Sequence, residues 1–220
     1  MWRFQLPEYL TTRPPALSYQ EKKNLFKDSH LLVAMDIFSH TLWAIALFLF
    51  LNQHFKKKFK IRWAALWGAF PDLVIPISFL LFVLIGMVFF GVHPAEVPKE
   101  HSDVITSPAY VSLIHPLTQV AYLASHSLVF FLIVFLLFFL FLRRPFWEMG
   151  GWLVHIMLDI PTHVHDFYPT QFLWPFLEIF LGGIPWQTSV FMTVNILLLL
   201  GMYCYLFRKQ LRRIFSRSPS

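Results

Sequence analysis

Long apolar stretches separated by short basic segments dominate this sequence of 220 residues. Residues 31–51 and 188–207 are apolar over about twenty positions each, and a helix of that length crosses the roughly 30 Å hydrocarbon layer of a bilayer. Hydrophobic residues make up 57% of the chain and charged residues 14%, whereas about 25% of a typical soluble domain is charged. The sequence therefore predicts an all-α, polytopic membrane helix bundle.

Five membrane spans are expected from the apolar runs, together with a short re-entrant or interfacial helix. The spans are placed at residues 31–51, 63–92, 117–142, 146–160 and 188–207. Pro71 interrupts the second run, so we expect a short helix and then a break or kink before the span proper. Pro161 is expected to stop the fourth span, and segment 172–184 to lie along the interface or to re-enter the bilayer.

The distribution of Lys and Arg predicts the orientation. These residues gather in segments 52–62, 143–144 and 208–217, whereas segments 93–116 and 162–187 contain one of them in total. Because basic loops remain on the cytoplasmic side, we expect a multi-pass protein of the cell's inner (cytoplasmic) membrane with its C-terminus in the cytoplasm.

The apolar and basic segments divide the chain into an N-terminal leader (1–30), a transmembrane domain (31–207) and a basic tail (208–220). The net charge of +6 does not indicate nucleic acid as a partner, because the basic residues flank apolar runs instead of covering a polar domain. The single cysteine, Cys204, excludes an intramolecular disulfide. The expected surroundings are the bilayer and its lipids.

Residues that can bind a metal interrupt the apolar runs at helical spacing. Asp36 and His40 are four residues apart in the first span, and His155 and Asp159 are four apart in the fourth, so each pair shares one helix face. Ionisable side chains inside a membrane are costly and mark functional sites. Carboxylate oxygens and imidazole nitrogens bind Zn²⁺ and similar ions. With two further residues, the predicted metal ligands are Asp36, His40, Asp72, His126, His155 and Asp159.

These donors suffice for one or two divalent ions, for which we expect zinc. Two ions about 3.5–4 Å apart can activate a water and hold both oxygens of a phosphoester displacement, so hydrolysis fits the set better than transport. Asp36 or Asp159 would orient the attacking water if it is not itself a ligand. The alternative is a non-enzymatic scaffold or a divalent-ion permease. His163, His165 and Asp166 suit a solvated loop as well as a metal or substrate role.

Four short motifs occur in order on separate apolar runs. They are MDIFSH (35–40), GAFPD (68–72), SHS (125–127) and HIMLD (155–159). In this order they resemble the YdjM-type family of membrane-bound metal-dependent hydrolases, and WPF (174–176) resembles that family's closing motif. The likeness covers residues 33–180 and depends on the order and spacing of the motifs.

The resemblance implies a relation to zinc-dependent phospholipase C and P1-type nuclease folds, with a phospholipid or another phosphoester as substrate. By position, the family's ligands match His40, Asp72, His126, His155 and Asp159, and Asp36 begins the first motif. The chain also departs from the family. Ser39 and Ser125 stand where Thr is frequent, and Val74 stands where a second acidic residue is frequent. Loss of that carboxylate implies one ion fewer or an altered second ion.

Overall fold

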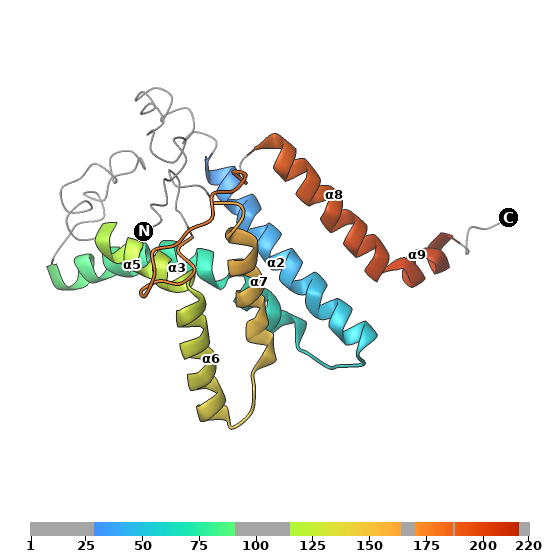
Figure 1. The fold of residues 1–220 in the computed structure, drawn as a ribbon, viewed down its shortest axis with the longest axis horizontal. Coiled ribbons are helices and arrows are strands. Elements are labelled where there is room, and N and C mark those ends of the chain that lie inside the picture. The colour runs from blue at the N-terminus through green and yellow to red at the C-terminus, as the bar shows by residue number, and fades with distance from the viewer. Residues whose placement is uncertain (1–28, 91–114, 164–169, 187, 216–220) are drawn as a thin grey trace, which may run out of the picture. The chain divides into compact units, whose positions relative to one another are not determined.

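The computed structural model describes residues 29–90, 115–163, 170–186 and 188–215. Over these residues the fold is all-α, as the sequence predicts, and contains no strand. The helices are α2 (Ser29–His54), α3 (Ile61–Phe90), α5 (His115–Ser125), α6 (Leu128–Leu142), the 3-10 helix η4 (Trp147–Met149), α7 (Gly150–Asp159), α8 (Ser189–Leu206) and α9 (Arg208–Phe215) (Figure 1).

The chain forms two units, residues 1–36 and 37–220. The packing described below is that of the second unit, which begins within α2 at Ile37. Nearly all of the predicted leader, and residues 93–114 of the segment 93–116, lie outside the described residues.

Small residues bring α3 very close to its neighbours. A Cβ atom added at Gly68 of α3 would lie 2.7 Å from the Cβ of Ala44 on α2, and one added at Gly151 of α7 would collide with the carbonyl oxygen of Ala64 on α3. Close approach at glycine and alanine is the usual way in which helices pack inside a membrane. α3 also packs against α5, so it is the helix around which this part of the chain is arranged.

An aromatic cluster fills the space between α3, α6 and α7. Trp152 of α7 stacks on Trp67 of α3, with ring centroids 5.8 Å apart, and meets Phe131 of α6 edge to face. Its indole Nε1 donates a hydrogen bond to the carbonyl of Ser125 at 2.6 Å. Because Ser125 is the last residue of α5, this bond ties the end of α5 to α7.

Polar contacts attach α8 to α2. The amide of Asn195 donates to Ser39 Oγ at 2.7 Å and accepts from Trp43 Nε1 at 2.8 Å, while Tyr203 donates to the carbonyl of Leu42. Most large apolar side chains of α8 are exposed, so these hydrogen bonds, and not apolar burial, are the main described contacts of the helix.

The described helices provide one or two candidate membrane spans instead of the five expected. α8 alone is both long and apolar enough, and α5 with α6 makes a second candidate only if the pair is one span bent by 72°. The expected fourth span is shorter than predicted, since α7 has 10 residues and at 1.5 Å per residue is only about 15 Å long. It does end just before Pro161, as expected.

Three other expectations about regular structure were wrong. α3 is a continuous helix that contains both Pro71 and Pro76, without the expected break. The run 117–142 is not one helix, because Ser127 caps the start of α6 by accepting hydrogen bonds from Val129 and Phe130. Segment 172–184 forms turns and irregular backbone instead of a helix, in keeping with Pro175 and the Gly182–Gly183 pair.

We predict that Gly151→Ala destabilises the protein while Gly201→Ala does not. A Cβ at Gly151 meets the backbone of α3, whereas a Cβ at Gly201 of α8 has nothing within 4 Å. Overpacking of this kind costs about 1–3 kcal/mol. Thermal unfolding of both variants in detergent is the measurement, and equal midpoints would show that the close contact of α3 with α7 contributes nothing.

Candidate metal centre

Five of the six predicted ligands come together in the second unit. His40 lies on α2, Asp72 on α3, His126 in the break between α5 and α6, and His155 and Asp159 on α7. Residues 119 positions apart in the sequence therefore share one site, as the ion pair between His40 and Asp159 shows. Two groups of three have donor atoms within 4.8 Å of one another: His40, His155 and Asp159, and Asp72, His126 and His155.

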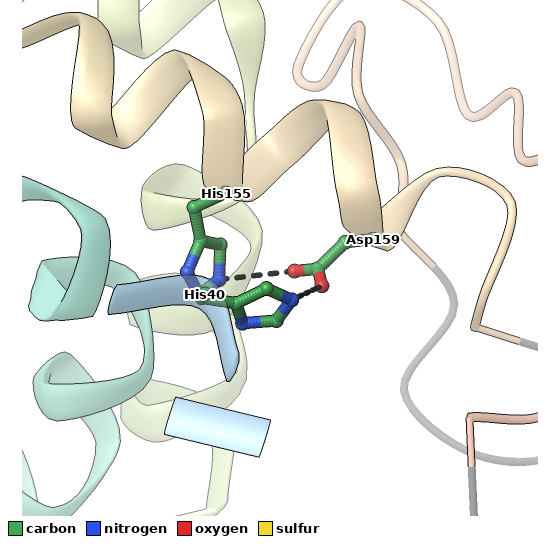
Figure 2. Close-up of side chains that lie close together, drawn as sticks. All are labelled: His40, His155 and Asp159. Carbon is green, nitrogen blue, oxygen red and sulfur yellow. Dashed lines mark ion pairs between the residues drawn. The ribbon is translucent and has the colours of Figure 1, made fainter. Parts of the chain in front are cut away.

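The carboxylate of Asp159 lies at the centre of the cluster. Its oxygens are 3.0 Å from Nε2 of His155, 3.1 Å from Nε2 of His40 and 3.2 Å from Nε2 of His126. Figure 2 shows His40 and His155 pointing toward this carboxylate from two different helices. The Asp159 side chain is completely buried, so its charge must be balanced from within the cluster.

Asp72 approaches the same imidazoles from α3. Its Oδ1 lies 3.5 Å from His155 Nε2 and 3.8 Å from His126 Nε2, and its Oδ2 lies 3.3 Å from His40 Nδ1. The side chain of Asp72 is 18% exposed, whereas those of the other four residues are at most 5% exposed. The cluster therefore meets its surroundings on the Asp72 side.

Backbone carbonyls fix which imidazole nitrogens can bind a metal. His155 Nδ1 is 2.8 Å from the carbonyl of Gly68, and His126 Nδ1 is 2.9 Å from that of Tyr122. A carbonyl only accepts hydrogen bonds, so each Nδ1 carries the proton and each neutral ring turns the lone pair of Nε2 into the cluster. Metal-binding histidines are oriented in this way by a second hydrogen bond.

The continuous course of α3 through Pro71 contributes to this arrangement. A proline within a helix removes a backbone donor and displaces carbonyls of the preceding turn. The Gly68 carbonyl, in that turn, accepts from His155, and the Pro71 carbonyl accepts from Ser125 beside His126. The proline expected to break the helix instead lies in the stretch of α3 whose carbonyls position the imidazoles.

Four donor atoms have mutual distances close to those of a tetrahedral site for five of their six pairs: Nε2 of His126 and His155, Oδ1 of Asp72 and Oδ2 of Asp159. The five distances between them given by the structure run from 3.0 to 3.8 Å. Ligands about 2.0–2.1 Å from a tetrahedral ion lie about 3.3–3.4 Å apart. The two Nε2 atoms, 3.2 Å apart, are both acceptors when the rings are neutral, so a shared cation would relieve their repulsion.

Asp36 is the sixth predicted ligand. It is half-buried on α2 and is the last residue of the first unit, so its part in the centre stays a prediction. His165 and Asp166 lie outside the described residues.

His163 lies beside the cluster, although the sequence left its role open between a solvated loop and a metal or substrate site. It is buried, and its Nδ1 lies 3.6 Å from Asp159 Oδ1. Burial lowers the pKa of this imidazole against the opposing attraction of the Asp159 carboxylate, which favours a neutral ring able to bind a cation. The available signal was its position four residues after Asp159, but Pro161 suggested a solvated loop.

Comparison with known proteins identifies no relative of this chain: no family model, no curated protein and no solved structure matches it. Function is therefore inferred from the geometry and chemistry of the residues themselves.

We predict that His155→Ala and His126→Ala abolish binding of zinc to the protein purified in detergent. Each substitution removes one of four atoms at tetrahedral spacing and leaves buried carboxylates without that partner. His54→Ala is the matched control, since His54 is exposed near the end of α2 and bonds Phe50 and Tyr205 instead. Metal content by mass spectrometry is the measurement, and zinc retained by both cluster variants would exclude this site.

Proposed function

We propose that this chain is a membrane-embedded, metal-dependent hydrolase that acts on a phospholipid or a related phosphoester. The observation that carries the proposal is the convergence of two carboxylates and three imidazoles in a nearly closed cluster. Two carboxylates neutralise a divalent ion, and nitrogen and oxygen donors together suit Zn²⁺ better than Mg²⁺ or Ca²⁺.

A bound ion would lower the pKa of a coordinated water and polarise a phosphoester oxygen. The residues of the chain itself would orient the ion and the substrate and keep bulk water out. Asp159 is buried among imidazoles and would hold the ion in place. The partly exposed Asp72 borders the side from which a substrate would arrive. The role of Asp36 in orienting the attacking water remains part of the proposal, as do the assigned ligands.

Exposed apolar surface supports a location in the bilayer. α6 exposes large side chains along its length, including Phe141 at 86%, and α8 does the same, including Leu197 at 61%. Surfaces of this kind are unfavourable in water and favourable in lipid. A multi-pass arrangement in the inner membrane, with a cytoplasmic C-terminus, is our proposal for the whole chain. It would bring a lipid headgroup within reach of the centre.

The motif order adds a separate line of support. The five clustered residues are those at which the chain resembles the YdjM-type hydrolases, and the geometry used above does not depend on that resemblance. A phosphoester substrate follows from the resemblance and from the chemistry of metal-bound water.

We predict that the purified protein hydrolyses phospholipid in mixed micelles, that a chelator abolishes the activity and that added zinc restores it. Asp159→Asn should be inactive because it removes the negative charge at the centre while keeping the shape of the side chain, and His54→Ala should retain activity. Phosphate or headgroup release is the measurement. Stoichiometric zinc without hydrolysis of any phosphoester tested would favour a metal-binding scaffold or a permease over an enzyme.

A further inference from the structure

The two oxygens of Asp159 face different partners. Oδ2 lies beside Nε2 of His126 and Nε2 of His155, within the tetrahedral set. Oδ1 lies 3.1 Å from Nε2 of His40 and 3.6 Å from Nδ1 of His163. The carboxylate thus has a second group of nitrogen neighbours that the four-atom set does not use.

His163 is held in place with a buried ring nitrogen, Nδ1, that makes no hydrogen bond. Its backbone N–H bonds the carbonyl of Asp159 at 3.1 Å, which fixes the turn after α7. The residue is 8% exposed, and Nδ1 has no hydrogen-bond partner. A buried polar atom without a hydrogen bond destabilises the fold, and a cation bound to Nδ1 would remove that penalty.

His40 presents a lone pair to the same oxygen of Asp159. Its Nδ1 is 3.3 Å from Asp72 Oδ2, and a carboxylate accepts, so a neutral ring carries its proton on Nδ1 and leaves Nε2 as an acceptor. That Nε2 faces Asp159 Oδ1. His40 Nε2, Asp159 Oδ1 and His163 Nδ1 are therefore three cation-binding atoms supplied by α2, α7 and the turn that follows α7.

We propose that these three atoms hold a second divalent cation, joined to the first through the carboxylate of Asp159. The proposal rests on the metal centre of the proposed function and adds His163 to its ligands. Two imidazoles and one carboxylate oxygen select zinc or a similar transition metal over Mg²⁺ or Ca²⁺.

The two positions differ in the number of protein donors. The first has four, which is typical of a closed zinc site, whereas the second has three, which is typical of a catalytic site with one position open to water or substrate. The second cation is therefore the one that a substrate oxygen would reach, and His163 becomes a determinant of activity separate from the first site.

The test is a count of zinc ions in the full-length protein. Protein in detergent is stripped with a chelator, reloaded with zinc chloride, freed of excess metal and analysed by mass spectrometry. The wild type should bind two zinc ions per chain and His163→Ala one, because the first site keeps all four of its donors. His54→Ala should bind two.

A second measurement needs no variant. The wild type loaded with manganese should give the electron paramagnetic resonance spectrum of a spin-coupled pair, since ions that share a carboxylate lie about 3.5–4 Å apart. One zinc per chain with uncoupled manganese, or two zinc ions retained in His163→Ala, would overturn the second site and leave the first intact. A wild type that binds no zinc would overturn the metal centre as a whole.

Discussion

The buried carboxylate of Asp159 is the constraint on which the rest of this structure depends. Placing an ion-sized charge out of contact with water costs several kcal/mol unless partners compensate it. Here Nε2 atoms of His40, His126 and His155 lie within 3.2 Å of its oxygens, and a cation held between these lone pairs and the carboxylate would supply the compensation. Because those residues lie on α2, in the α5–α6 break and on α7, one charged group fixes how three parts of the chain approach one another.

The irregular features of the fold serve this centre. The break between α5 and α6 puts His126 at a corner, where its ring reaches the cluster and its Nδ1 bonds the Tyr122 carbonyl. The Gly68 carbonyl of α3 orients His155, and the glycines at 68 and 151 let α2 and α7 come close enough to α3 for these contacts to form. The site therefore depends on glycine at these two positions as well as on its ligands.

The distribution of polarity is the reverse of that in a soluble enzyme. Large apolar side chains cover the outer faces of α6 and α8, while ionisable groups are gathered inside. In a bilayer this arrangement keeps the hydrophobic surface in lipid and places the reactive groups where the low dielectric strengthens their interaction with a cation. The proposed hydrolysis would require a route for water, and Asp72 is the most exposed of the five clustered side chains.

The sequence by itself determined the helical class and five members of the cluster, because buried ionisable side chains stand out against apolar runs and because a spacing of four places His155 and Asp159 on one helix face. It did not determine the continuity of helices: a break or kink was expected at Pro71 and none at Ser127, yet α3 continues through Pro71 and a new helix starts after Ser127. Only the tertiary structure decided which oxygen of Asp159 faces which imidazole, and it alone brought His163 into the centre. The physical reason is that the pairing of donor atoms depends on how separate helices pack, which no local pattern of residues encodes.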